Sequence, residues 1–182
     1  MTSSGGLIRP EVFHPKDSLL SGPAGGVVGA SQKGLRSGYR KLITFDMGGT
    51  STDVSRFNEE YEYRFGLEIG DVRIFSPAVS IETVAAGGGS LCYFDGFKLC
   101  VGPESAGAHP GPACYGAGGP LSITDINLLA GRMDAERFGI PVSRESSTAK
   151  LDDLIEDILK STGKRRRRGE VISGFLQIAD ET

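Results

Sequence analysis

The stretch that decides the fold is residues 41–55, which read KLITFDMGGTSTDVS. An apolar run ends at Asp46, two glycines follow, and three hydroxyl residues lead to a second carboxylate, Asp53. A returning run then ends at Phe57. This order is typical of two strands joined by a tight turn. We interpret the turn as a loop that binds the phosphates of a nucleotide.

The residue types in this turn suit phosphate binding. Gly48 and Gly49 have no Cβ, so the backbone can adopt φ > 0 and bring several N–H donors against phosphate oxygens. The hydroxyls of Thr50, Ser51 and Thr52 add further donors. The same residues also fit a surface hairpin with a type I′ turn at Gly-Gly and hydroxyls that cap it. The complete string D-x-G-G-T-x-T-D favours the phosphate loop.

Two carboxylates flank the turn. Asp46 stands where the first strand should end, so it could hold Mg²⁺ directly or through water, or orient an attacking water. Asp53 could do either from the opposite strand. Both residues are therefore candidates for catalysis and for metal binding, and the sequence leaves their division of roles open.

The turn resembles the phosphate hairpin of the ATPase fold of actin, sugar kinases and Hsp70. The string FDMGGTSTDVS is similar to that of the hydantoinase A and 5-oxoprolinase family. Three further strings match that family in order: LLSGPAGGVVGA at 19–30, TVAAGGGS at 83–90, and VGPESAGAHPGPACYGAGGPLSITDINLLAGR at 101–132. The resemblance is strong over residues 1–132 and weak beyond them.

The resemblance implies an α/β chain that is a fragment of an actin-like, ribonuclease H-like ATPase fold. An antiparallel strand meander, a glycine-rich irregular loop and C-terminal helices are expected within it. We expect residues 1–140 to form a partial ATPase domain and residues 141–182 to be its helical continuation. The fold's other phosphate hairpin and its adenosine segment have no counterpart here, so we expect a truncated fragment that is inactive alone.

The resemblance also implies an activity. In this family ATP is thought to phosphorylate the carbonyl of a lactam or hydantoin before water opens the ring. The expected cofactors are ATP and Mg²⁺, and the expected partners are a small cyclic amide and a hydantoinase B-like subunit or domain. Two alternatives remain: a kinase or acetone-carboxylase-like subunit of the same superfamily, or a catalytically silent fragment that binds a partner protein.

The resemblance assigns roles to individual residues. Asp46 and Asp53 serve the metal or the water. The nucleotide is held by residues of the turn and of a second glycine cluster, namely Gly48, Gly49, Thr50, Thr52, Gly87, Gly88, Gly89 and Ser90. From its residues alone, that second cluster could cradle an anion with its amides or be a flexible connection.

Residues 102–120 are rich in glycine and proline and have little periodicity, so they should form a rigid irregular loop. Its residues with reactive side chains include Glu104 and His109, to which we assign a role in holding the loop or the substrate. The spacing from His109 to Cys114 matches no zinc pattern. Thr124 or Asp125 should cap the helix that follows.

The composition excludes several classes of protein. Glycine accounts for 27 of 182 residues, about twice the usual share of roughly 7%. These glycines cluster in motifs without a period, so they indicate close backbone approach and not a fibre. The net charge of −3 provides no excess of positive charge of the kind that binds a nucleic acid or a membrane. With no apolar run long enough to span a bilayer and no signal peptide, a cytoplasmic location is expected.

Helical patterns lie on both sides of the hairpin. Residues 22–33 should form a short helix with a ridge of glycines where another backbone can approach. Near the C-terminus, apolar residues from Leu151 to Leu159 recur at helical spacing, and a second helix begins near Val171. We interpret the basic run at 164–168 as a solvated loop between the two.

Overall fold

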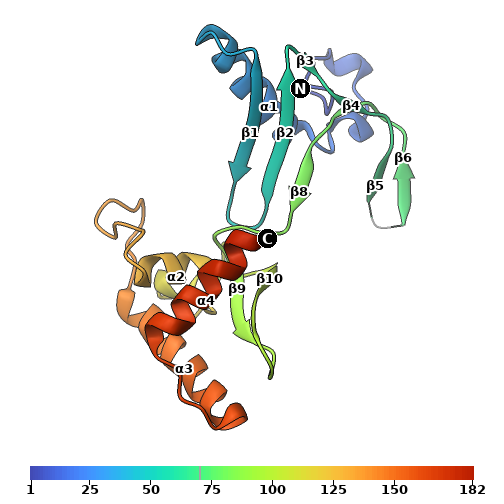
Figure 1. Ribbon diagram of the computed structural model, residues 1–182. Coiled ribbons are helices and arrows are strands. Elements are labelled where there is room, and N and C mark those ends of the chain that lie inside the picture. Colours follow the sequence, from blue (N-terminus) through green and yellow to red (C-terminus); the bar gives the residue numbers. More distant parts are fainter. Residues whose placement is uncertain (70) are drawn as a thin grey trace. The chain divides into compact units, whose positions relative to one another are not determined.

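The computed structural model describes residues 1–69 and 71–182, which form two compact units. Unit 1 comprises residues 1–46 and 53–83, and unit 2 comprises residues 47–52 and 84–182. Figure 1 labels most of their helices and strands. The expected fold class, α/β with antiparallel sheets, is confirmed. The expected domain boundary at residue 140 stays a prediction.

The principal sheet of unit 1 is built around a β-hairpin. Strands β1 and β2 lie side by side in opposite directions, and β3 and β8 both pair with β2 (Figure 1). The strands are β1 (Lys41–Met47), β2 (Thr52–Asn58), β3 (Glu60–Tyr61) and β8 (Glu82–Val84). The meander expected from the sequence is therefore present.

The third strand of the meander, β3, is short. After β3 the chain continues into β4 (Tyr63–Arg64), which pairs with β7 (Ala78–Val79) and not with β2. The amide of Ser80 donates to the carbonyl of Glu62 at 2.7 Å, so the later segment takes over the pairing. A further hairpin joins β5 (Leu67–Ile69) to β6 (Val72–Ile74).

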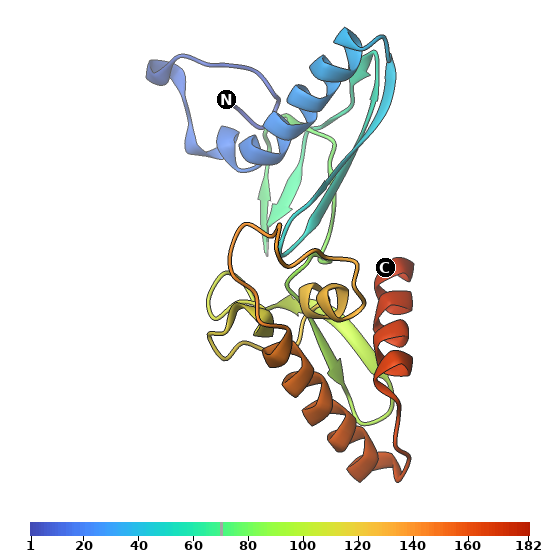
Figure 2. The same ribbon diagram turned by 90° about the vertical axis from the view of Figure 1, so that its left-hand side faces the viewer.

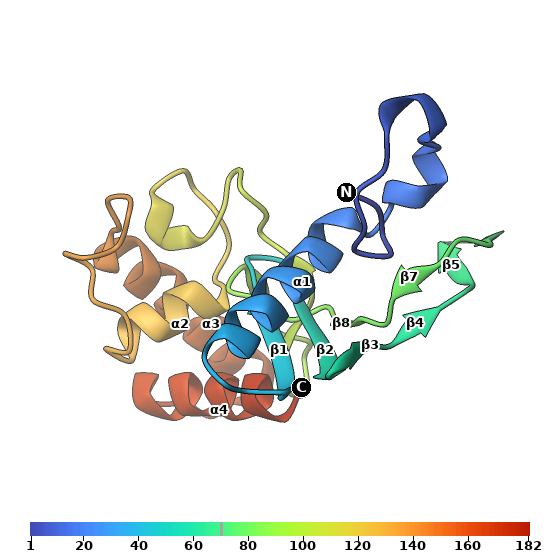
Figure 3. The same ribbon diagram turned by 90° about the horizontal axis from the view of Figure 1, so that it is seen from above.

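Helix α1 (Ser21–Arg36) contains the expected helix and extends it at its C-terminal end. Figure 3 shows it alongside β1 and β2. Its buried Ala24 and Val27 pack with Val79 and Ile81 in a small core. Of its glycines, Gly25 faces the Met1 side chain, whereas the other three are more open: Gly22, Gly26 and Gly29. Close packing of the whole ridge in the intact protein stays a prediction.

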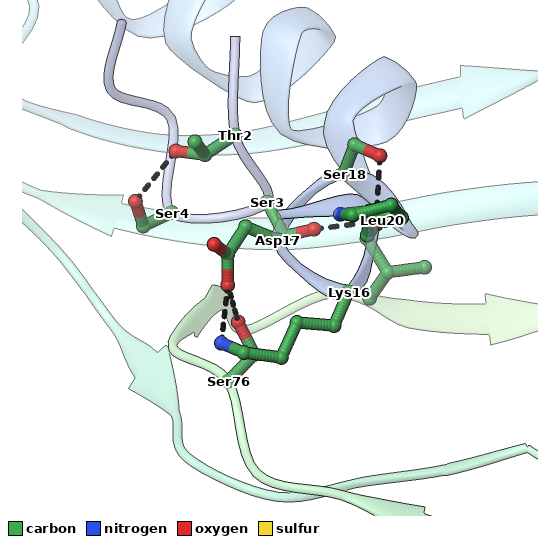
Figure 4. A network of polar contacts seen from close by, with 9 residues as sticks. Thr2, Ser3, Ser4, Lys16, Asp17, Ser18, Leu20 and Ser76 are labelled. Atoms are coloured by element: carbon green, nitrogen blue, oxygen red, sulfur yellow. Dashed lines mark hydrogen bonds and ion pairs between the residues drawn. The ribbon is translucent and has the colours of Figure 1, made fainter. Parts of the chain in front are cut away.

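The N-terminal segment is tied down by polar contacts (Figure 4). It includes two short 3₁₀ turns, Pro10–Val12 and Pro15–Ser18. The amide of Ser3 donates to the Asp17 carbonyl at 2.6 Å, and the Asp17 carboxylate accepts from the Ser76 hydroxyl at 2.8 Å. The contacts with Lys16 and then with Ser76 lower the pKa of Asp17.

Unit 2 packs three helices with one hairpin (Figure 2). The hairpin joins β9 (Ser90–Phe94) to β10 (Leu99–Ser105), and a 3₁₀ turn covers Ala113–Tyr115. The helices are α2 (Ile123–Leu129), α3 (Arg144–Thr162) and α4 (Arg168–Glu181). Their core includes the fully buried Ile126, Leu151 and Phe175. The C-terminal helices are thus confirmed, and Gly163 ends α3 with a φ of 70°.

No helix within residues 1–69 and 71–182 is long and apolar enough to cross a membrane.

Candidate functional site

The turn between β1 and β2 leaves backbone donors free. The Gly48 amide donates to the carbonyl of Ser51 at 2.9 Å, which closes the turn. In the part of the chain that the structure describes, the amides of Gly49, Thr50 and Ser51 donate to no protein acceptor. Gly49 and Thr50 are also exposed. Three consecutive amides of this kind are suited to an anion.

The conformation of the turn differs from the expected one. Neither Gly48 nor Gly49 has a positive φ, so the prediction that these glycines adopt φ > 0 is wrong. A type I′ turn needs φ > 0 at both central residues, so that alternative is wrong as well. A Cβ on Gly49 would meet nothing within 4 Å, which means that the space in front of the turn is open.

The second glycine cluster binds directly to this turn. We call residues 87–90 the glycine strap. The Gly88 amide donates to the carbonyl of Gly48 at 3.0 Å, and the Gly89 amide donates to that of Gly49 at 2.6 Å. The other two amides are used inside the strap, by Gly87 to the Ser90 hydroxyl and by Ser90 to the Gly87 carbonyl. All four donors therefore have protein acceptors.

Close approach explains why the strap is made of glycine. A Cβ on Gly87 would lie 2.7 Å from backbone atoms of Gly49 and Thr50. One on Gly89 would lie 2.8 Å from the carbonyl oxygen of Gly49. A Cβ essentially never comes this close to a non-bonded backbone atom, so a side chain at either position would push the strap off the turn. The assignment of the strap to the nucleotide site stays a prediction, and its observed contacts hold the turn.

The hydroxyls around the turn have different surroundings. The buried Thr52 hydroxyl donates to the Ala86 carbonyl at 2.6 Å and so fastens the start of β2. The Thr50 hydroxyl is exposed and lies 3.5 Å from that of Ser105, which in turn donates to the carbonyl of Gly49 at 3.4 Å. Sequence reasoning missed Ser105, because no local pattern relates it to a turn so far away in the chain.

The two candidate carboxylates belong to unit 1. Asp46 and Asp53 line one cavity of about 230 Å³, together with residues of α1 and β1: Pro23, Gly26, Val27, Ala30, Thr44 and Phe45. Asp53 accepts a hydrogen bond from the Thr83 hydroxyl at 2.7 Å. Asp46 is exposed and accepts no hydrogen bond from the residues that the structure describes.

This donor set fits Mg²⁺. Mg²⁺ usually takes one or two carboxylates from the protein and fills its other positions with water and phosphate oxygens. Asp46 and Asp53 on one cavity meet that requirement. Among the described residues, no three His, Cys, Asp or Glu side chains cluster as metal ligands.

Glu104 and His109 are both exposed. Glu104 lies on β10, and His109 lies in the loop that follows. Neither side chain makes a hydrogen bond or an ion pair within the described ranges. Their assignment to the loop or the substrate stays a prediction.

The glycine-rich loop is anchored by Asp125, which the sequence indicates only as a candidate helix cap. This fully buried carboxylate accepts five hydrogen bonds. They come from the amides of Ala113, Cys114 and Ser122 and from the hydroxyls of Ser122 and Ser147. The N-cap residue is Ser122, so neither Thr124 nor Asp125 is the N-cap, but the Asp125 carboxylate completes a capping box by accepting from the Ser122 amide. The spacing Ser-x-x-Asp was the available signal.

The thiol of Cys114 is buried, and its surroundings favour the protonated form. Burial, and secondarily the negative charge of Asp125, raise the pKa of Cys114 to about 12. Burial likewise raises the pKa of Cys92, with Asp125 again the second cause. Both thiols therefore stay protonated near neutral pH.

Comparison with known proteins gives a consistent result. Residues 1–182 match the hydantoinase/oxoprolinase family. The 5-oxoprolinase PfmaA of Pestalotiopsis fici is 45% identical, and the match covers 100% of this chain. The caprolactamase subunit alpha of Pseudomonas jessenii is 40% identical over 98% of this chain. The chain spans only 15% of the length of the first relative and 28% of the second.

Two solved structures share the fold. A nucleotide-free acetone carboxylase superposes with a TM-score of 0.85 at 26% identity, covering 100% of this chain and 26% of that protein. The ATP-dependent caprolactamase of Pseudomonas jessenii superposes with a TM-score of 0.77 at 31% identity, covering 99% of this chain and 26% of that protein.

Proposed function

We propose, since this chain belongs to the hydantoinase/oxoprolinase family, that it forms the phosphate-binding part of an ATP-dependent cyclic-amide hydrolase. The relatives named 5-oxoprolinase and caprolactamase support this class of substrate. The solved caprolactamase is an ATP-dependent enzyme, which supports the use of ATP. Because the chain spans a small part of these proteins, the activity is proposed for the full-length protein.

The observation that carries this proposal is the row of three amides at Gly49, Thr50 and Ser51, which have no partner among the described residues. Exposed amides bind water, and a row of amides held in one conformation can exchange that water for the oxygens of an anion. The phosphate oxygens of ATP can supply the acceptors. The hydroxyl of Thr50 adds one further donor on the exposed side of the turn.

The reaction explains why ATP is needed. An amide carbonyl resists attack by water because its carbon is weakly electrophilic. Transfer of the terminal phosphoryl group to the carbonyl oxygen releases ADP and makes that carbon electrophilic. Water then adds to the carbon and the ring C–N bond breaks, which leaves an acyl phosphate. A second water hydrolyses the acyl phosphate to the carboxylate and free phosphate. The products are an open-chain amino acid, ADP and phosphate.

Asp46 and Asp53 are proposed to hold Mg²⁺ or the water. Mg²⁺ would neutralise charge on the phosphates as the phosphoryl group moves. Asp46 is better placed for a metal, because its carboxylate has no hydrogen-bond donor among the described residues. Asp53 is already oriented by the Thr83 hydroxyl, and a carboxylate held in this way is suited to positioning the attacking water.

The direct test uses the full-length protein with 5-oxoproline and Mg·ATP. Open-chain product, ADP and phosphate should form in equal amounts and only together. ADP release without ring opening of any cyclic amide in a panel of lactams and hydantoins would argue against this class of substrate. Absence of Mg·ATP binding by calorimetry would reject the phosphate-binding role itself.

A second candidate is a carboxylase that activates its substrate with ATP. It is favoured by one observation, the higher TM-score with the acetone carboxylase than with the caprolactamase. Sequence identity points the other way, at 26% against 31%. Incubation with acetone, bicarbonate and ATP separates the two, because only a carboxylase forms a new C–C bond.

We further propose a partner subunit or domain. The support is the name of one relative, which calls it the alpha subunit of a caprolactamase. A hydantoinase B-like protein is the expected companion. Co-purification of the full-length protein from its source, followed by mass measurement of the intact complex, tests this proposal.

A further inference from the structure

We propose that Thr124 is a positioning residue for the phosphate-binding turn, acting through the glycine strap. This inference rests on the proposed function, since it assigns to Thr124 the task of holding a turn that binds ATP. Thr124 itself does not contact the turn. It binds the strap residue whose peptide group binds the turn.

The contact is made to a single carbonyl group. The Thr124 amide donates to the Gly88 carbonyl at 2.7 Å, and the Thr124 hydroxyl donates to the same oxygen at 2.8 Å. The N–H on the other side of that peptide group belongs to Gly89, and it donates to the carbonyl of Gly49 at 2.6 Å. One peptide group therefore links the start of α2 to the turn.

This arrangement strengthens the bond to the turn. Two donors on a carbonyl oxygen polarise the peptide group and make its N–H a better donor, because hydrogen bonds in a chain reinforce one another. The same two donors also stop the Gly88–Gly89 peptide from rotating. That restraint matters here because glycine has more backbone freedom to lose than any other residue.

The start of α2 is a firm support for this task. Asp125, the next residue, is fully buried and accepts five hydrogen bonds, so the backbone beside Thr124 is fixed. Ser122 also forms an isolated bridge to Leu91, one residue beyond the strap. A Cβ on Gly88 would lie 2.9 Å from the Thr124 hydroxyl oxygen, so the two residues are packed too closely for a side chain at Gly88.

Two substitutions of Thr124 distinguish the contribution of its hydroxyl from that of its shape. Thr124→Val keeps the shape and the backbone amide but removes the hydroxyl, and Thr124→Ser keeps the hydroxyl. Thr148→Val is a matched control, because the Thr148 hydroxyl donates to the Arg144 carbonyl at the same 2.8 Å in an exposed part of α3. All variants are made in the full-length protein.

Two measurements are made on each variant. Calorimetry gives the Kd for Mg·ATP, and hydrogen exchange without nucleotide gives the protection of the Gly88 and Gly89 amides. We expect Thr124→Val to raise the Kd and to lower the protection by about 3- to 10-fold each, the effect of one hydrogen bond. Thr124→Ser should restore both values, and Thr148→Val should leave both unchanged.

The outcomes distinguish this inference from the proposed function. If the unsubstituted protein does not bind Mg·ATP, the proposed function fails, and the exchange data still decide whether Thr124 holds the strap. If the protein binds Mg·ATP and Thr124→Val binds it equally well with unchanged protection, the positioning role is overturned. Equal damage from Thr124→Ser would also overturn it, since the hydroxyl would then be irrelevant.

A second variant serves if Thr124→Val does not fold. Gly88→Ala disturbs the same contact from the other side, because its Cβ would press on the Thr124 hydroxyl. It should raise the Kd for Mg·ATP and lower the protection of the Gly89 amide, because the Thr124 hydroxyl can no longer hold the Gly88 carbonyl. Unchanged affinity and unchanged protection in Gly88→Ala would contradict the inference.

Discussion

Unit 2 contains two hairpin turns that differ in where their backbone amides find acceptors. The turn at Asp95–Lys98 satisfies itself: the Asp95 amide donates to the Lys98 carbonyl, and the Asp95 carboxylate accepts from the amides of Phe97 and Lys98 at 2.8 and 2.9 Å. The turn at Gly48–Ser51 leaves three amides without acceptors among the described residues and is held by the distant strap. A turn that keeps its donors free for a ligand needs support from elsewhere in the chain.

The glycine within the Asp95–Lys98 turn and the glycines that support the Gly48–Ser51 turn differ in the same way. Gly96 has a φ of 102° and nothing near its absent side chain, so it serves the conformation of its own turn. Gly87 and Gly89, in the strap, have no positive φ, but a Cβ on either would overlap the Gly48–Ser51 turn. Glycine is therefore required for a local reason in one turn and for a long-range contact in the other.

The largest expected effect is on chemistry. Asp46→Asn in the full-length protein keeps the size of the side chain and removes its charge. We expect ATP-dependent ring opening to fall by roughly 100-fold or more, while the thermal midpoint stays the same because Asp46 makes no hydrogen bond to described residues. Steady-state kinetics and calorimetric unfolding on one preparation test this. An Asp46→Asn protein that is active but destabilised would make Asp46 a turn residue.

The next largest effect tests the long-range contact. Gly87→Ala places a methyl group 2.7 Å from the backbone of Gly49 and Thr50, so the strap has to move and the turn loses its support. We expect Mg·ATP affinity to fall by about tenfold or more. In the control, Gly96→Ala, the residue is strained at positive φ, which costs roughly 1–2 kcal/mol of stability and leaves the affinity unchanged. Equal losses of affinity in both variants would end the distinction between the turns.

A smaller effect is expected at Asp95. Asp95→Ala removes the acceptor for two turn amides, so the thermal midpoint should fall by a few degrees at most. Mg·ATP affinity should not change, because the hydrogen bonds of Asp95 lie within its own turn and do not hold the Gly48–Ser51 turn. Differential scanning calorimetry and titration calorimetry measure the two quantities. Weakened nucleotide binding in this variant would mean that the hairpin β9–β10 acts on the site.

The smallest effect concerns pH. Hydrogen bonds from the amides of Lys98 and Phe97 lower the pKa of Asp95 below the usual value for an aspartate. A depressed folded-state pKa gives a stabilisation that is present above the unfolded pKa and is lost as the pH falls through the folded pKa. We therefore expect Asp95→Asn to lose less stability than the unsubstituted protein as the pH falls below about 4, the usual pKa of an aspartate. Identical acid-unfolding curves would count against the turn geometry.

The sequence predicts best what depends on neighbours in the chain. The Asp95–Gly96 turn, the apolar spacing of α3 and the end of that helix at Gly163 all depend on contacts within a few residues, and each is observed. The strings shared with one family also predict the fold class correctly. Such features are visible because a short segment contains the whole physical cause.

The rest depends on partners that the sequence does not reveal. The residues of the strap suggest an anion cradle, but the acceptors for its amides at Gly88 and Gly89 lie 40 residues earlier, at Gly48 and Gly49. The third strand is cut short because Ser80 bonds to Glu62. The sequence places Asp125 at a helix end, and its five donors come from three separate segments.

The five hydrogen bonds to Asp125 also set a limit on how this chain can be shortened for laboratory work. One donor, the hydroxyl of Ser147, comes from the first turn of α3 and lies 2.7 Å from the carboxylate. A version that stops at residue 143 loses this donor and uncovers the carboxylate, together with the apolar residues that α3 buries around Leu151. The glycine-rich loop would then lose its anchor, although every residue of the loop is still present. Any expression boundary that is meant to preserve the loop must therefore lie beyond α3.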